Sequence, residues 1–444
     1  SNRYWCQKEI QFAKESNKPM VVVNHLKKSE DRIFPHCVNV PSVRVQSNSE
    51  ISDGEKYRVI TIALLETLRH HYHTQFLENY NSDSVLILNR PPELTDIPLL
   101  IKNSGGKIDK NFNAILYPEP PVYENELKFL VPFGIKAETP LSHYAPLLKG
   151  STIGISVSEP DKKEISKIGQ SESHLINLSQ TIARHLLFRR ATLVYGGDLR
   201  LRNNFTEYLC EEALIVKDCI KEFGPLLKNF SAWPIYNITN DRVIEWNSQN
   251  HQIAEMIEVD PPSKVRSGYN TDKFLPPDSP LNLFAWSLSL TKMRNEMIDK
   301  CDYRICAGGR LFGYKGKYPG VLEEILISIK LKKPLYLIGG FGGITSRVCD
   351  FIIGGNIAEE LTYDWQVDHT LSYSKLSELF YKDPSESNID YSGVLGEIAT
   401  LGLEGLSRGN GLTVDQNKRL FKSEFIDEVV MLIVKGIDNL THGY

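Results

Sequence analysis

Two glycine-rich segments in the second half of the chain constrain its fold more than any other feature. The first is A-G-G-R-L-F-G-Y-K-G-K-Y-P-G at 307–320, directly after the short, mostly apolar run 303–306. The second is G-G-F-G-G at 339–343, directly after the apolar run 334–338. Apolar residues at helical spacing occupy 321–331 between them. This order of strand, loop, helix, strand and loop predicts an α/β fold whose parallel sheet carries ligand loops at the carboxyl ends of its strands.

The first glycine-rich segment has the properties of an anion site. Glycines lack a Cβ, so their backbone amides can approach an anion closely. Arg310, Lys315 and Lys317 add positive charge, and a helix that begins near Pro319 and Gly320 would direct its positive end at the same place. We therefore predict a phosphate site. The alternative is a pair of tight turns in which the glycines serve only the backbone.

An earlier part of the chain repeats this pattern. A strand is predicted at 154–157, a helix at 171–188 and a second strand at 191–195, which leads into Gly196-Gly197 and a helix from about 205. Neither region matches G-x-x-x-x-G-K-[ST] or the full dinucleotide-binding fingerprint. A nucleotide site of another kind is required.

Several motifs in order make a specific resemblance. They are I-S-V-S-E at 155–159, V-Y-G-G-D-L-R at 194–200, T-K-M-R at 291–294, A-G-G-R at 307–310, Y-P-G-V-L-E-E at 318–324 and Y-L-I-G-G-F-G-G at 336–343. Over about 150–355 the chain resembles the SLOG superfamily, and more narrowly the branch found beside TIR domains and in TRPM-type channel sensors. The resemblance implies a Rossmann-like pocket for a nucleotide, often an ADP-ribose derivative, that serves more often in a sensor than in an enzyme.

The predicted ligand-binding residues come from these motifs. For the phosphates we predict the side chains of Arg200, Arg294, Arg310 and Lys315 and the backbone amides of Gly196, Gly197, Gly308, Gly309, Gly320, Gly342 and Gly343. For the ribose or base we predict Ser156, Ser158 and Glu159, and we place Glu324 and Phe341 in the same site.

Relatives in the lysine-decarboxylase-like group suggest an alternative, because they hydrolyse nucleotide N-glycosidic bonds with a P-G-G-x-G-T-x-x-E motif. The matching stretch here, 319–324, lacks the second glycine and the threonine. Under this alternative Glu323 or Glu324 would be the acid-base group. A third reading is a binding module without catalysis.

The start of the chain carries a second resemblance. W-C-Q-K-E-I-Q-F-A-K at 5–14 predicts a helix, N-K-P-M-V-V-V-N at 17–24 a strand, and 57–80 a long helix with Ile60, Ala63, Leu64, Leu68 and Phe76 on one side. The region resembles the C-terminal half of a flavodoxin-like TIR domain, whose first half we expect upstream. The resemblance implies that Glu9 is the catalytic residue and NAD the substrate. An anion beside the ribose would stabilise the oxocarbenium-like charge that develops as nicotinamide leaves.

These patterns predict three parts: half of a TIR domain at 1–82, a proline-rich α/β linker module at 83–148, and a SLOG domain at 149–444 with an irregular insertion at 224–280. The leading hypothesis is an antiviral defence effector. A nucleotide second messenger, either an ADP-ribose derivative or a cyclic nucleotide, would bind the SLOG domain. The chain would then form a homo-oligomer through TIR and SLOG contacts, and the TIR domains would cleave NAD.

Composition excludes several other classes. The formal net charge of -4 favours neither nucleic acid nor an acidic membrane as a partner, and apolar runs such as 429–434 are too short to span a bilayer. The seven cysteines form no C-x-x-C pair, which is typical of a cytoplasmic protein with reduced thiols. His70, His71 and His73 point in different directions on a helix, so we expect no metal site.

Overall fold

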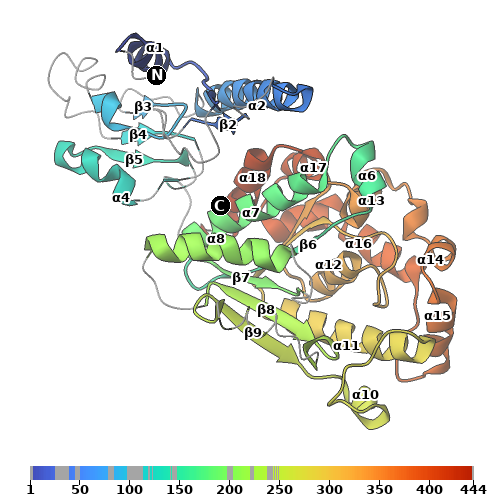
Figure 1. Ribbon diagram of the computed structural model, residues 1–444. Helices are drawn as coiled ribbons and strands as arrows, with labels where there is room; N and C mark the ends of the chain where they lie inside the picture. The colour runs from blue at the N-terminus through green and yellow to red at the C-terminus, as the bar shows by residue number, and fades with distance from the viewer. Residues whose placement is uncertain are drawn as a thin grey trace. The chain divides into compact units, whose positions relative to one another are not determined.

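Two compact units make up the chain in the computed structural model, residues 1–145 and 146–444 (Figure 1). The residues that the structure describes are 4–25, 40–45, 51–78, 85–97, 114–118, 121–122, 124–140, 142, 148–197, 204–220, 225–237, 244, 246, 248 and 250–442. Both units combine helices with parallel strands, which confirms the predicted α/β class. The second unit begins close to the predicted start of the nucleotide-binding domain.

The first unit contains two small parallel sheets. Helix α1 (Tyr4–Glu15), strand β1 (Val22–Asn24), strand β2 (Ser42–Arg44) and helix α2 (Asp53–Glu78) follow one another, and β1 pairs with β2. The second sheet consists of β3 (Val85–Ile87), β4 (Ala114–Leu116) and β5 (Lys136–Glu138), accompanied by η1 (Leu94–Asp96), α4 (Glu124–Leu127) and η2 (Lys128–Phe133). A largely buried ion pair, with Lys14 Nζ 2.6 Å from Glu93 Oε2, joins α1 to the chain that follows β3.

Helix α2 does not bury the face that its sequence predicts. Ile60, Leu64 and Leu68 are each more than half exposed, whereas the inward stripe includes His73 and Leu77. The helical spacing of apolar residues in 5–14 also predicts that Trp5 lies in the core, but Trp5 is 74% exposed. Both expectations were wrong because helical spacing identifies an apolar stripe but not whether anything covers it.

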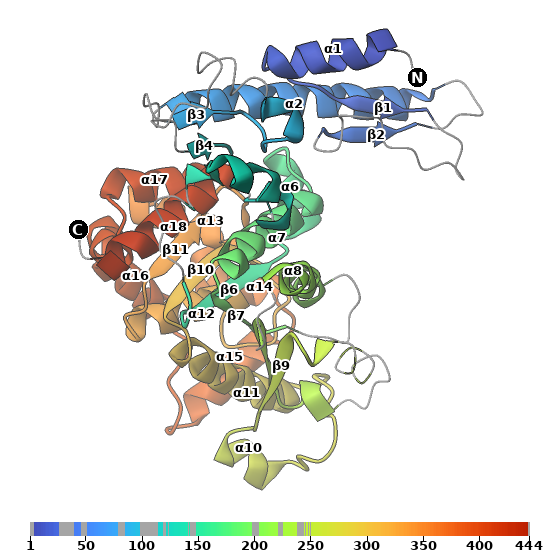
Figure 2. The ribbon, with the colours of Figure 1, turned by 90° about the vertical axis from the view of Figure 1, so that its left-hand side faces the viewer.

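A six-stranded parallel sheet forms the centre of the second unit (Figures 1 and 2). Its strands are β6 (Thr152–Ser158), β7 (Thr192–Tyr195), β8 (Leu227–Ala232), β9 (Ala254–Val259), β10 (Tyr303–Gly308) and β11 (Leu335–Ile338). The strand order is β11-β10-β6-β7-β8-β9. The chain therefore leaves β6 in one direction and later returns to its other side through β10. The carboxyl ends of β6 and β10 mark this reversal, which is where open α/β sheets bind their ligands.

Helices cover both faces of this sheet. Helices α7 (Glu172–Phe188) and α8 (Phe205–Ile220) lie on one face, and α11 (Pro280–Asp299) and α12 (Gly320–Lys330) lie on the other (Figure 2). Met293 and Met297 of α11 pack against Val194 and Phe230 of the sheet. Helix α11 begins at Pro280, because Ser279 Oγ accepts a hydrogen bond from Asn282 N and Pro280 suits the first turn.

The segment 224–280, predicted to be an irregular insertion, contains two strands of the central sheet. Strands β8 and β9 pair along their whole length, from Leu227 opposite Ala254 to Ala232 opposite Val259. The remaining described elements of this segment are η3 (Ile235–Asn237) and α10 (Ser263–Gly268). The prediction failed because polar residues such as Lys228 and Asn229 interrupt the apolar pattern, although Asn229 is fully buried and bonds to Gly197.

The last part of the chain is a group of helices, of which α13, α16 and α17 pack against β11 at the edge of the sheet (Figure 2). They are α13 (Gly343–Gly354), η4 (Glu359–Leu361), α14 (Tyr363–His369), α15 (Tyr373–Lys382), α16 (Tyr391–Asn410), α17 (Val414–Lys422) and α18 (Ile426–His442). A further short helix, α6 (Lys162–Lys167), follows β6. The several glycines of 402–413 and its weak apolar periodicity predict a surface loop, but this prediction is wrong, because α16 continues through a kink at Gly402 to the buried Asn410.

Candidate functional site

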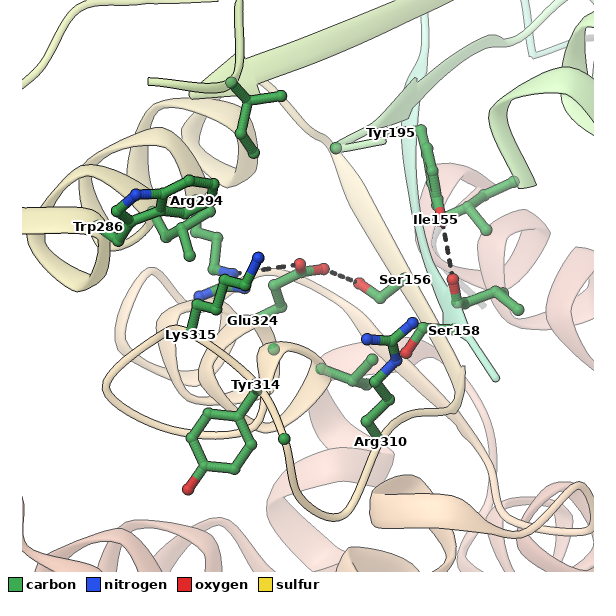
Figure 3. Close-up of a pocket in the computed structure, with 17 residues that line it drawn as sticks. Ile155, Ser156, Ser158, Tyr195, Trp286, Arg294, Arg310, Tyr314, Lys315 and Glu324 are labelled. Carbon is green, nitrogen blue, oxygen red and sulfur yellow. Dashed lines mark hydrogen bonds and ion pairs between the residues drawn. The ribbon is translucent and has the colours of Figure 1, made fainter. Parts of the chain in front are cut away.

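A cavity of about 440 Å³ opens at the carboxyl ends of β6 and β10 (Figure 3). Its lining comes from β6, from the end of β7, from α11, from the loop after β10 and from the first turns of α12. These residues are Ile155, Ser156, Val157, Ser158, Tyr195, Gly196, Ile235, Trp286, Leu290, Arg294, Arg310, Gly313, Tyr314, Lys315, Gly320, Val321 and Glu324. The volume lies in the range of small-molecule sites.

Eight of the predicted ligand-binding residues line this cavity. They are Ser156, Ser158, Gly196, Arg294, Arg310, Lys315, Gly320 and Glu324. Figure 3 shows the charged side chains of Arg294, Arg310, Lys315 and Glu324 around a common space. All four lie within 294–324, and the reversal of strand order places this stretch beside Ser156 and Ser158 of β6.

Other predicted residues do not line the cavity. Gly309 N donates to Ser158 O at 2.7 Å, and Gly309 O accepts from Ile344 N at 3.1 Å, so both backbone groups of Gly309 are used within the protein. A Cβ on Gly343 would lie 2.4 Å from Gly309 O, because the two glycine-rich loops pack on each other. The predicted residues that do not line the cavity are Glu159, Gly197, Gly308, Gly309, Phe341, Gly342 and Gly343. Arg200 lies outside the described residues.

Arg294 and Lys315 are held by neighbouring side chains. Arg294 is buried, its NH1 donates to Glu323 Oε2 at 2.5 Å, and its Nε lies 3.5 Å from Glu324 Oε1. Lys315 Nζ lies 4.7 Å from the centroid of the Trp286 ring. Arg310 is exposed at the cavity edge. The cavity thus presents three positive charges, one of them buried and fixed in place.

The sequence did not reveal the group that holds Glu324. Ser156 Oγ donates to Glu324 Oε2 at 2.5 Å, and the guanidinium of Arg304 donates to the same oxygen. Arg304 is fully buried in β10, and its Nε also donates to Ser156 Oγ at 2.7 Å. Burial lowers the pKa of Arg304, but the charge of Glu324 more than offsets this, so the pKa is raised and Arg304 stays protonated. An arginine inside an otherwise apolar strand was the signal available in the sequence.

Glu159 belongs to a carboxyl pair beside the cavity. Burial and the neighbouring Glu172 together raise the pKa of Glu159 to about 7, against the opposing charges of Arg310 and Lys162. Glu159 does not line the cavity, but it interacts electrostatically with Arg310, which does. The prediction of a direct ligand contact has no support from the lining.

One wall of the cavity is apolar and was also missed. Trp286 and Leu290 of α11, Ile235 of η3 and the ring of Tyr195 contribute to it. Trp286 Nε1 donates to Leu275 O at 2.7 Å, and Tyr195 OH donates to Val157 O at 2.9 Å, so hydrogen bonds fix both rings. Such a wall can receive a planar base.

Glu9, the predicted catalytic residue, lies on the exposed side of α1 in the first unit. Within the part of the chain that the structure describes, no three His, Cys, Asp or Glu side chains come together as a metal site requires. None of the described helices has both the length and the apolar character needed to cross a membrane.

The comparisons with known proteins agree with this geometry. The profile of the family described as SLOG cluster2 matches residues 147–420, which is more than half of the chain and includes every residue of the cavity lining. No curated protein gives a match. With its parallel sheet, its ligand cavity at the reversal of strand order and this profile match, the chain belongs to the SLOG cluster2 family.

Proposed function

We propose that the second unit binds a nucleotide of the ADP-ribose class in the cavity at the ends of β6 and β10. The observation that carries this proposal is the meeting of Arg294, Arg310 and Lys315 with an apolar wall around Trp286 in a cavity of about 440 Å³. Cations suit the phosphates, and a tryptophan ring suits the base. Membership of a SLOG family supports the same ligand class.

The chemistry of the lining suggests how such a ligand is held. Arg310, Lys315 and the N-terminus of α12 at Gly320 provide positive potential for the phosphates. Glu324 is an acceptor that can receive ribose hydroxyls, and Ser158 can donate or accept. Ser156 and Arg304 already hold the Glu324 side chain in place without a ligand. Glu324 therefore loses little conformational entropy when a ligand binds.

Calorimetric titration of the full chain with ADP-ribose, AMP and inorganic phosphate tests this proposal. We expect Arg310→Ala to weaken ADP-ribose binding by roughly 10- to 100-fold, because a charge-assisted hydrogen bond contributes about 1.5–3 kcal/mol. Lys330→Ala is the matched control, since Lys330 is an exposed cation at the other end of α12. Equal affinities for Arg310→Ala and the wild type would contradict the proposed site.

We further propose that the chain is a defence effector in which nucleotide binding brings copies together and the first unit cleaves NAD to nicotinamide and ADP-ribose products. The support is the W-x-x-x-E pattern at 5–9, the exposed position of Glu9, and the parallel strands beside α1 and α2. A ligand can drive such a change only by binding the assembled state more tightly than the separate chains.

NAD consumption by the full chain, with and without ADP-ribose, tests this second proposal. Glu9→Gln should abolish the loss of NAD, whereas Glu15→Gln, a change at another exposed carboxylate of α1, should not. If only Glu324→Gln abolished the activity, the catalytic residue would instead lie in the second unit. If no ligand concentration produced NAD loss, even with the expected upstream half of the TIR domain restored, the chain would be a binding module without catalysis.

Hydrolysis in the SLOG cavity is the weaker alternative. Glu323 does not line the cavity, and it accepts hydrogen bonds from Arg294 and Thr291. Glu324 does line the cavity, but Arg304 and Ser156 both donate to its Oε2. An acid-base catalyst must exchange a proton with its substrate. These contacts favour a binding role for Glu324.

A further inference from the structure

The loop between β10 and α12, residues 309–319, supplies four residues to the cavity lining. These are Arg310, Gly313, Tyr314 and Lys315. The loop contains three glycines, and two of them, Gly309 and Gly313, have φ values of 97° and 71°. A glycine-rich loop of this kind loses much conformational entropy when it becomes ordered. Contacts with the rest of the protein must therefore hold it in the conformation that forms the cavity.

Gln366 of α14 makes the most direct of these contacts. Its side chain is fully buried, and its Nε2 donates to Leu311 O at 2.9 Å and to Glu360 O at 2.8 Å. Its Oε1 accepts a hydrogen bond from Tyr314 OH at 2.9 Å. One amide thus holds the 309–319 loop at two points and ties it to the chain just before α14.

Tyrosines of the next two helices extend the contact. Tyr373 OH donates to Lys317 O at 2.7 Å, and Tyr391 OH lies 3.2 Å from Tyr314 OH and 3.3 Å from Tyr373 OH. Lys317 Nζ donates to Ser387 Oγ at 2.6 Å. In Figure 3 the hydroxyl of Tyr314 points away from the space that Lys315 and Arg310 surround. The loop therefore has one side toward the cavity and the other side bonded to residues 366–391.

We infer that Gln366 is a positioning residue for ligand binding: it does not line the cavity, but its amide fixes the loop that does. Identification of the ligand rests on the proposed function, whereas the contacts of Gln366 do not. If Gln366 is lost, the loop samples several conformations, and only a fraction of the molecules can bind. The apparent affinity then falls in proportion to that fraction.

Two measurements on the full chain test this inference with the variant Gln366→Leu. Trypsin can cut the loop after Arg310, Lys315 or Lys317, so the rate of cleavage at these sites without ligand reports how often the loop opens. Calorimetry reports the affinity for ADP-ribose. We expect loop cleavage to become about tenfold faster and affinity to fall about tenfold, with the fold retained by circular dichroism.

Asn417→Leu is the matched control. Asn417 is also a buried amide of the C-terminal helices, but it bonds to Asn410, Leu412 and Thr413. It should lower the melting temperature without faster loop cleavage. If Gln366→Leu does not fold, Tyr314→Phe can replace it, because this variant removes the hydroxyl that donates a hydrogen bond to Gln366 Oε1. Tyr314→Phe should change the cleavage rate and the affinity in the same directions by a smaller factor.

The outcomes separate this inference from the proposed function. Unchanged loop cleavage and unchanged affinity in folded Gln366→Leu would overturn the positioning role, as would equal loop cleavage in Asn417→Leu. If the wild type fails to bind ADP-ribose, the proposed function fails. The ligand-free cleavage rate then still decides the role of Gln366: a faster rate in Gln366→Leu supports it, and an equal rate overturns it.

Discussion

Lys315 Nζ lies over the ring of Trp286 in the wall of the candidate nucleotide cavity, 4.7 Å from the ring centroid. A cation–π interaction of this kind contributes about 0.5–2 kcal/mol, which is less than a hydrogen bond between charged groups can provide. A ligand phosphate can therefore draw the ammonium away from the ring. Phosphate binding by Lys315 would therefore change the environment of the Trp286 indole ring.

Tryptophan fluorescence should report this movement. We expect ADP-ribose to change the emission of the wild type, and Trp286→Phe to remove most of the change even though the chain has four other tryptophans. Lys315→Met should weaken binding by roughly 10- to 100-fold through the lost charge. An unaltered emission change in Trp286→Phe would show that the ring does not sense the ligand.

Arg304→Met should destabilise the protein strongly. The change leaves Glu324 without its buried partner, and removal of one member of a buried ion pair typically costs about 3–5 kcal/mol. The double variant Arg304→Met with Glu324→Gln should recover part of the loss, because no uncompensated charge remains. Urea unfolding of the wild type, the two single variants and the double variant measures both effects, and a fully additive result would contradict the coupling.

Stability should depend on pH through Glu159. The folded protein keeps a proton on this carboxyl up to a pKa of about 7, whereas an ordinary glutamate releases it near 4.5. The folded state therefore binds the extra proton in this window, so the stability falls as the pH rises from about 4.5 to 7. The groups that face Glu159 are Glu172, Arg310 and Lys162. Glu159→Gln should flatten this part of the profile, as measured by urea midpoints at pH 5, 6, 7 and 8, and an unchanged slope would refute the assignment.

Gly343→Ala should destabilise the second unit by more than the backbone strain alone. Gly343 has a φ of 66°, and an added Cβ would lie 2.4 Å from Gly309 O. Gly355 has a φ of 69° but nothing within 4 Å of an added Cβ. Gly355→Ala thus reports the strain of about 1–3 kcal/mol without the collision. The melting temperature of Gly343→Ala should be well below that of Gly355→Ala. Equal melting temperatures would show that the loops that contain Gly309 and Gly343 can separate.

The sequence predicted the central part of the fold well because its strands are short apolar runs. β6, β10 and β11 are buried on both faces, so their patterns are nearly continuous, and the helix that begins at Gly320 lies where it was expected. β8 was missed because Asn229 is buried through hydrogen bonds to Gly197, a partner that only the tertiary structure supplies.

The candidate site was predictable only in part. Arg310 and Lys315 were predicted because cations beside glycines indicate an anion site, and Arg294 was predicted from the SLOG resemblance. The role of Arg304 was not, since its partner Glu324 follows 20 residues later on another element. We predicted that the second glycine-rich loop, 339–343, contacts the ligand. In the structure Gly343 packs against the backbone of Gly309, because a glycine has no side chain to keep the two loops apart.

The hydrogen bonds that Gln366, Tyr373 and Tyr391 make with the 309–319 loop have a consequence for the newly synthesised chain. All six strands of the central sheet are complete by Ile338, well before Gln366 leaves the ribosome. Because domains fold from the N-terminus as they emerge, the sheet can form before the loop has its partners. The loop therefore takes its final shape last, and a product terminated before α14 would lack both the residues that hold the loop and core residues such as Tyr373 and Phe380 that pack in one cluster with the sheet.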